Sequence, residues 1–157
     1  MNFDITDMPD LSGDGASIYS VTLEGENQTL LEQFFDENEG YEKELSEILN
    51  KLLTMGHKTG CRRDFFKHNE GKPGDGVAVL KAGCLRLYCL YVDSTIVCFG
   101  SGGYKSPHIR AYQEDTVLNA KVVQMEEIAE RINRAIKEKD IEIKDGQLII
   151  NFWDYED

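Results

Sequence analysis

The sequence predicts one α+β domain: a strand, a helix hairpin, a three-strand antiparallel meander and a C-terminal helix, followed by an extra C-terminal β-hairpin. Three observations lead to this prediction. Alternating runs rich in β-branched and aromatic residues predict strands at 17–23 and within 77–100. Apolar residues recur at helical spacing between 29 and 55 and again between 116 and 139. Asp145–Gly146, flanked by alternating apolar residues, is a strong hairpin signal.

These patterns divide the chain into three segments. Residues 1–16 are rich in Asp, Gly and Ser without periodicity, so we expect an irregular N-terminal extension. Residues 17–139 carry the α+β domain, and residues 140–157 carry a β-hairpin and an acidic tail that pack on the same domain. A chain of 157 residues with 41% hydrophobic residues is long enough to bury a core of its own.

The first two helices have recognisable boundaries. Thr29 followed by Glu32 predicts a capping box at the start of the first helix. The second helix is predicted from about Tyr41 to Met55, with Gly56 where a left-handed C-terminal glycine is expected. Each helix has one apolar face, so we expect the two to pack as a hairpin on a sheet.

The meander is predicted over 77–100, with Asp93–Ser94 as a two-residue turn before its last strand. This turn implies a register in which Cys89 and Cys98 are cross-strand neighbours. In that register Arg86 shares a sheet face with Tyr88, Leu90, Val97, Phe99 and Ser101. A longer turn would shift the register and exchange the faces.

The cysteine content predicts neither a metal site nor a cofactor. Zinc ligands are usually brought together by closely spaced pairs, and no CxxC pair occurs here. We therefore expect buried, reduced thiols. No apolar run approaches the roughly 20 residues of a membrane span, and the first residues, MNFDITDMPD, do not resemble a signal peptide. The prediction is a cytoplasmic protein without a membrane partner.

The net charge of −12 is unevenly distributed along the chain. Residues 1–54 carry a net charge of −11 and residues 113–157 a net charge of −6. Residues 55–112 hold nine Lys or Arg against four Asp or Glu, a net charge of +5, together with all three histidines. Charges are screened over about 10 Å, so a local basic face can bind a polyanion despite the acidic remainder. A sheet whose solvated face carries Lys and Arg explains the same pattern.

The stretch VAVLKAGCLRLYCLYVDSTIVCFGSGGYK, residues 77–105, has an apolar strand, an Arg-aliphatic-aromatic strand, a short turn and an apolar strand closed by Lys. Together with the element order, it resembles the RelE/ParE toxin superfamily, including its HigB-like and phage-derived RelE-like branches, over about residues 17–139. Arg86 matches the Arg of the family's middle strand, and Lys105 matches the lysine that closes its last strand. Arg62 and Arg63 match the basic stretch before the sheet.

This chain also departs from the family pattern. Family members that cut mRNA are usually basic, whereas this chain is acidic. Where the family often has a Glu-Leu-Arg triplet, this chain has Val79, Leu80 and Lys81, so a general base is missing. The paired lysines after the last strand are reduced here to Lys105.

The resemblance implies a toxin of a toxin–antitoxin system that cleaves mRNA on the ribosome without a metal, with an antitoxin protein as a further partner. A base removes the proton of a ribose 2′-OH, cations stabilise the phosphoryl oxygens, and an acid protonates the departing 5′-oxygen. The candidate catalytic residues are Arg86, Lys105 and His108.

The chemistry of each residue type supports these roles. Arg86 offers a guanidinium that suits phosphate, and His108 is of the residue type most often used for acid–base catalysis. Tyr104 is a candidate for stacking on a base, and Arg62, Arg63 and Lys81 are further RNA-binding candidates. A solvated sheet Arg, a solvated loop His and a Tyr that caps the core are the alternative explanations.

The stretch FGSGGYKSPH, residues 99–108, does not predict a nucleotide-binding P-loop. That motif places Gly directly before Lys-Ser and another Gly five residues earlier, where this chain has Tyr104 and Cys98. We interpret it as a strand end that brings Lys105 and His108 near Arg86.

A second functional hypothesis is a non-catalytic binding protein of the same fold, either a gyrase-directed toxin or an inactive relic that acts through protein partners. The missing glutamate and the net charge favour it, whereas the +5 segment favours the endoribonuclease. The tail FWDYED, residues 152–157, suggests that acidic and aromatic residues cover the basic face. The sequence leaves the oligomeric state open.

Overall fold

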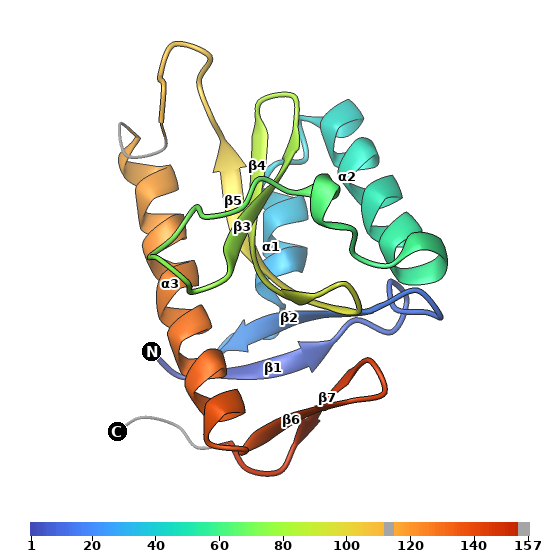
Figure 1. Cartoon of the computed structure of the whole chain (residues 1–157). Helices are drawn as coiled ribbons and strands as arrows, with labels where there is room; N and C mark the ends of the chain where they lie inside the picture. Colours follow the sequence, from blue (N-terminus) through green and yellow to red (C-terminus); the bar gives the residue numbers. More distant parts are fainter. Residues whose placement is uncertain (112–114, 154–157) are drawn as a thin grey trace.

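The computed structural model of the protein describes residues 1–111 and 115–153 (Figure 1). It confirms the α+β class, with a five-stranded sheet, three helices and a separate two-stranded sheet after the last helix. The order of the large sheet is β1-β2-β5-β4-β3, in which β2 and β5 are parallel and the other pairs are antiparallel. Its strands are β1 (Phe3–Asp7), β2 (Ser17–Leu23), β3 (Val77–Ala82), β4 (Leu85–Asp93) and β5 (Ile96–Tyr104).

The N-terminal segment is more regular than expected. Residues 1–16 were predicted to be irregular, but β1 lies within them and pairs with β2 from Phe3↔Leu23 to Asp7↔Tyr19. Phe3 is fully buried, and its burial holds the strand against the core. Asp4 and Asp7 of this strand are exposed. Because Asp is uncommon in strands, these two residues obscured the strand pattern in the sequence.

The register between β4 and β5 differs from the predicted one. Leu90 pairs with Cys98, and Cys89 pairs with Phe99. The two-residue loop is Ser94–Thr95, because Asp93 still pairs with Ile96 and its carboxylate accepts hydrogen bonds from the backbone N–H and hydroxyl of Thr95, both at 2.7 Å. This one-residue shift places Cys89 and Cys98 on opposite faces of the sheet, so they are not cross-strand neighbours.

One face of the sheet is covered by α1 (Leu30–Glu37) and α2 (Glu42–Thr54). The capping box of α1 is confirmed: the Thr29 hydroxyl accepts from the Glu32 backbone N–H, and the Glu32 carboxylate accepts from the Thr29 N–H. α2 ends within one residue of the predicted end at Met55, but Gly56 is not the expected left-handed cap, because the chain continues in a π-helical turn, Met55–Thr59. A Cβ at Gly56 would overlap the carbonyl oxygen of Leu11, so this glycine permits close packing of two backbone segments.

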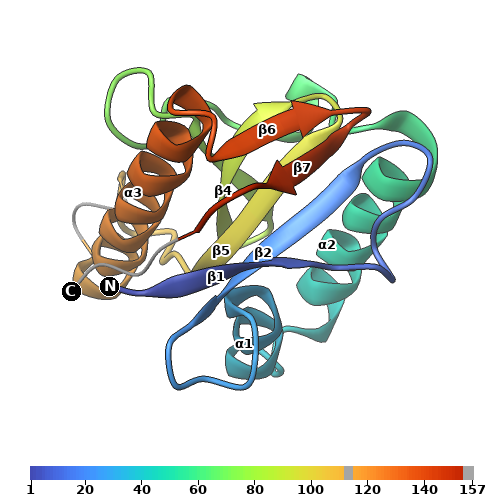
Figure 2. The same cartoon turned by 90° about the horizontal axis from the view of Figure 1, so that it is seen from below.

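The opposite face is covered by α3 (Thr116–Lys137), as Figure 2 shows from below. Asp115 caps this helix by accepting hydrogen bonds from the backbone N–H groups of Val117 and Leu118. The apolar stripe of α3 packs on side chains of the sheet that point away from α1 and α2. The sheet therefore separates two apolar clusters.

The C-terminal hairpin consists of β6 (Ile141–Lys144) and β7 (Gln147–Ile150). Its predicted turn is confirmed, with positive φ angles of 53° at Asp145 and 70° at Gly146. The hairpin is joined to the main sheet by the Leu148 backbone N–H, which donates to the Tyr19 hydroxyl at 3.0 Å.

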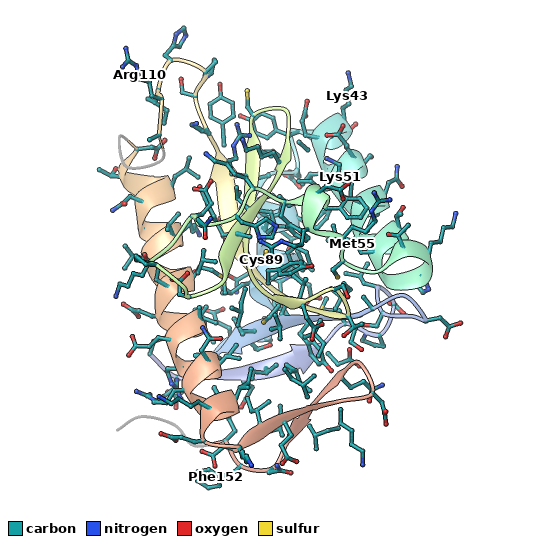
Figure 3. The ribbon with its side chains drawn as sticks, viewed as in Figure 1. Lys43, Lys51, Met55, Cys89, Arg110 and Phe152 are labelled. Atoms are coloured by element: carbon teal, nitrogen blue, oxygen red, sulfur yellow. The ribbon has the colours of Figure 1, made fainter. Side chains whose placement is uncertain are left out.

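The first two residues of the tail lie far from the basic segment of the chain. The Trp153 indole donates to the Phe3 carbonyl oxygen at 2.6 Å, which places it beside β1. Figure 3 shows Phe152 at one end of the molecule and Arg110 at the other. Phe152 and Trp153 therefore do not cover the basic face, and residues 154–157 of the tail lie outside the described part of the chain.

Candidate functional site: a basic cavity on the sheet

A cavity of about 280 Å³ lies on the α3 side of the sheet, near the edge formed by β3. Val79 of β3 and Tyr88 of β4 belong to the apolar cluster that includes α3, and both line the cavity. The remaining walls are the loop at 67–71 and the segment at 105–111, which follows β5. Three separate parts of the chain thus enclose one hollow.

Five cationic side chains line this hollow, which we call the basic cavity: Lys67, Lys81, Arg86, Lys105 and Arg110. Lys81 and Arg86 are direct cross-strand partners on β3 and β4. Lys67 belongs to an isolated bridge with Val79, two residues before Lys81. Arg110, labelled in Figure 3, lies on the segment beyond β5. The fold therefore gathers cations from positions up to 43 residues apart in the sequence.

Arg86 is held in place by the backbone. Its Nη1 donates to the carbonyl oxygens of Gly83 at 2.7 Å and Leu85 at 2.9 Å. These two bonds occupy one of the three guanidinium nitrogens and fix the orientation of the planar group. A guanidinium fixed in this way loses little side-chain entropy when it binds an anion.

Lys105 orders the segment beyond β5. Its backbone N–H donates to the Cys84 carbonyl oxygen at 2.7 Å, which extends the pairing past the end of the strand. Its ammonium group donates to the Arg110 carbonyl oxygen at 3.1 Å and closes the loop between these two residues. Lys105 thus contributes charge to the cavity and holds the segment that carries Arg110.

The loop on the other side pairs with the outer edge of β3. Lys67 and Val79 exchange two backbone hydrogen bonds of 2.9 Å, and the Glu70 N–H donates to the Val77 carbonyl oxygen at 3.1 Å. The Glu70 side chain is only 10% exposed, and its carboxylate lies 3.2 Å from the Lys67 ammonium group. Glu70 also lines the cavity, so a carboxylate accompanies the five cations.

The charged groups of the cavity change the pKa of Lys81. Burial lowers the pKa of its ammonium group, and the positive charges of Lys67, Arg86 and Lys105 lower the pKa further. Glu70 acts in the opposite direction. The field at Lys81 is therefore positive, which favours binding of an anion.

The structure brings three of the seven predicted site residues together: Lys81, Arg86 and Lys105. Arg62 and Arg63 lie elsewhere. Arg62 pairs with Asp64 at 3.0 Å, and the Arg63 guanidinium lies 5.3 Å from the centre of the Tyr91 ring. Tyr91 packs in the cluster on the α1 and α2 side of the sheet, so Arg63 is on the face opposite the basic cavity.

The other two predicted residues also lie outside the cavity lining. The Tyr104 ring stacks on Tyr41, with centroids 5.5 Å apart and 17° between the planes. Tyr104 pairs in register with Leu85, which belongs to the α1 and α2 face. His108 is exposed on the segment beyond β5, where its backbone N–H donates to the Ser106 hydroxyl at 3.2 Å.

The sequence analysis missed Lys67, Glu70 and Arg110 as site residues. The two cations belong to the +5 segment, and that charge excess was the available signal. No feature of the sequence marks Glu70 as a site residue, because its position depends on how the loop pairs with β3.

The chemistry of the lining favours a phosphate-bearing ligand. Several cations around one hollow repel one another, and a multiply charged anion relieves that repulsion. A volume of 280 Å³ is about nine times the ~30 Å³ of one water molecule in the liquid. A phosphate group, with five heavy atoms, leaves room for atoms of an attached sugar.

Across residues 1–111 and 115–153, no three His, Cys, Asp or Glu side chains are grouped so that they could hold a metal ion. No helix in the same residues has the length and apolar character needed to cross a membrane.

Comparisons of the chain with protein-family models, with curated proteins and with solved structures find no match.

Proposed function

We propose that the basic cavity binds a phosphodiester of RNA and that the protein is a toxin-like endoribonuclease that cleaves mRNA. The observation that carries the proposal is the convergence of five cationic side chains on a cavity large enough for a phosphate and part of its sugar. The resemblance of residues 77–105 to RelE/ParE toxins independently suggests RNA as the substrate. Arg86 and Lys105 are the two residues on which both arguments agree.

In this proposal the cations play two roles. Arg86, oriented by its backbone contacts, binds the non-bridging phosphate oxygens and stabilises the charge that develops on them. Lys67, Lys105 and Arg110 hold the flanking backbone by charge. No resident metal is required, because the cations of the chain supply the electrostatic stabilisation.

The first test is binding of a fluorescent single-stranded RNA by the purified full chain. We expect Arg86→Ala to weaken binding at least tenfold at low salt. Arg62→Ala is the matched control, because it removes an exposed guanidinium that lies outside the cavity. Affinity should fall with salt, and Arg110→Ala should reduce the slope of log K against log salt by about 0.7. Equal loss for Arg62→Ala and Arg86→Ala would contradict binding in this cavity.

The second test is growth arrest when the chain is expressed in bacteria. We expect arrest with the parent chain and no arrest with Arg86→Ala or Lys105→Ala, when all variants accumulate equally. Cleavage of reporter mRNA, mapped by primer extension, should follow the same order. A parent chain that neither arrests growth nor cuts RNA would overturn the proposal.

A non-catalytic binding protein of the same fold is the second candidate. It is favoured by the position of His108, the predicted proton carrier, outside the cavity lining. Under this hypothesis a gyrase-directed toxin or an inactive relic acts through a protein partner. Growth arrest that survives both Arg86→Ala and Lys105→Ala would support this candidate over the endoribonuclease.

A further inference from the structure

The basic cavity contains a carboxylate in addition to its cations. Glu70 is the carboxylate among the described residues that line it. Its side chain is 10% exposed, so its position is set by the surrounding residues. The backbone around it is fixed by the paired hydrogen bonds of Lys67 with Val79 and by the bond from the Glu70 N–H to Val77.

Glu70 is a counter-ion within the cavity, because its carboxylate lies 3.2 Å from the Lys67 ammonium group and five cations line the same hollow. Cleavage of RNA through the 2′-OH also needs a group that accepts a proton. The sequence has Val79 at the position on this strand where the resembled family often has a glutamate, so β3 offers no carboxylate to this face.

Glu70 and Lys81 both line the basic cavity. The negative charge of Glu70 raises the pKa of Lys81, in the direction opposite to the effect of the neighbouring cations. The cavity lining therefore includes an acceptor and a donor of protons, one from the loop and one from β3.

We propose that Glu70 is the general base and Lys81 the general acid of RNA cleavage in the basic cavity, an assignment that rests on the proposed endoribonuclease function. Glu70 thereby replaces, from the loop before β3, the carboxylate that β3 itself lacks. His108 has no part in the reaction.

The reaction is a transesterification without any redox change. The Glu70 carboxylate takes the proton of the ribose 2′-OH while the 2′-oxygen forms a bond to phosphorus. The bond between phosphorus and the 5′-oxygen breaks, and that oxygen takes a proton from the Lys81 ammonium group. The products are a 2′,3′-cyclic phosphate and a 5′-hydroxyl. Transfer of a proton from Glu70 to the Lys81 amine, directly or through water, restores the starting state.

The surroundings of Lys81 suit an acid. Lys67, Arg86 and Lys105 act on it with positive charge and Glu70 with negative charge. The other polar side chains of the lining are Asn69, Tyr88 and Arg110. Burial and the three cations lower the pKa of Lys81, which makes its ammonium group a stronger proton donor than an ordinary lysine.

The experiment measures single-turnover cleavage of a short single-stranded RNA by the full chain, together with its Kd. We expect Glu70→Gln to slow cleavage about 10²–10⁴-fold, while RNA binding stays equal or becomes tighter because a negative charge is lost. Glu26→Gln, on an exposed turn, is the matched control and should cleave at the parental rate. Formate should partly restore cleavage to Glu70→Ala and should not accelerate the parent chain.

A modified substrate separates the two roles. Lys81→Arg keeps the positive charge but donates a proton poorly, because arginine holds its proton too tightly. An RNA with sulfur in place of the bridging 5′-oxygen has a leaving group that needs no acid. This substrate should restore the rate of Lys81→Arg and should leave Glu70→Gln slow.

A parent chain that cleaves RNA, with Glu70→Gln equally active, would overturn this assignment and leave the proposed function intact. Equal loss of binding and cleavage in Glu70→Gln would also overturn it, because Glu70 would then only support the cavity wall. Failure of the sulfur substrate to restore Lys81→Arg would overturn the acid role. A parent chain that does not cleave RNA would overturn the proposed endoribonuclease itself.

Discussion

Lys81 and Arg86 face each other as direct cross-strand partners on β3 and β4. Like charges in this position destabilise an antiparallel pair. Lys67 and Lys105 add to the repulsion, because both act on Lys81. A sheet edge with these two charges is less stable than the same edge with a neutral residue at one of the positions. A bound anion would recover the lost stability.

Removal of one of the two charges should therefore stabilise the free protein. We expect Lys81→Gln to raise the free energy of unfolding by about 0.2–1 kcal/mol and to weaken RNA binding in the same preparation. Urea unfolding and RNA titration measure the two effects. Lys58→Gln, an exposed lysine on the π-helical turn, should change neither. A less stable Lys81→Gln variant would show that the charge pair does not strain the sheet.

Gly102 positions Arg86 by allowing β4 and β5 to approach closely. Between the pairs Leu87↔Gly102 and Cys89↔Phe99, two residues of β5 face one of β4, which forms a β-bulge. A Cβ on Gly102 would overlap the carbonyl oxygen of Arg86 and lie 3.0 Å from the Leu87 Cα.

We therefore expect Gly102→Ala to destabilise the protein by about 1–3 kcal/mol and to weaken RNA binding through displacement of Arg86. Gly103→Ala is the matched control, since its Cβ would lie 3.7 Å from a Leu118 methyl group, an ordinary contact. Chemical denaturation of both variants measures the difference. Equal stability of the two variants would contradict the role assigned to Gly102.

Arg131 joins the two ends of the described chain. Its guanidinium lies 4.7 Å from the Phe3 ring and 4.9 Å from the Trp153 ring, and it donates to the Met1 carbonyl oxygen at 2.8 Å. We expect Arg131→Ala to cost about 1–3 kcal/mol through lost cation–π and hydrogen-bond contacts. Trp153 is the single tryptophan of the chain, so its emission should shift to the red when this contact is lost.

The exposed Lys137 on the same helix provides the control for this prediction. Lys137→Ala should leave the tryptophan emission unchanged. An unchanged spectrum for Arg131→Ala would show that the packing of Trp153 does not depend on the guanidinium.

The buried thiols should make the protein sensitive to alkali. Burial raises the pKa of Cys61 and Cys98 from 9.0 to about 12, and burial also raises the pKa of Cys89. Below pH 9 both the folded and the unfolded chain keep these protons, so their contribution to stability is complete. Between pH 9 and 12 only the unfolded chain loses them, so stability falls as pH rises, by about 1.4 kcal/mol per thiol for each pH unit.

Urea unfolding at pH 8 and pH 10 measures this loss. Cys98→Ala should lose less stability between the two pH values than the parent chain, whereas alanine at the less buried Cys84 should not change the difference. Lys81 acts with the opposite sign, because its lowered pKa makes stability rise with pH. The comparison between variants therefore isolates the thiol effect. An identical pH dependence for Cys98→Ala would contradict it.

Local patterns in the sequence predicted much of the fold. The capping box at Thr29, the type of turn at Asp145–Gly146 and the meander depend on neighbouring residues, so they could be recognised without the structure. β1 was missed because its one fully buried side chain, Phe3, is surrounded by residues typical of a loop. The left-handed conformation expected of Gly56 was wrong, because this glycine packs against a distant segment at Leu11.

The site was only partly predictable, because it also depends on contacts between segments that are distant in the sequence. The sequence by itself determined that residues 55–112 carry the positive charge and that Arg86 and Lys105 belong to a strand and a strand end. Only the tertiary structure decided which cations meet, because the bulge and the one-residue shift between β4 and β5 decide which face each side chain occupies. That geometry places Lys81, Arg86 and Lys105 with Lys67, Arg110 and Glu70, and it places Arg63 and Tyr104 on the opposite face. Charge composition is a property of the sequence, whereas a charged cavity requires side chains from distant segments to lie on the same face of the sheet.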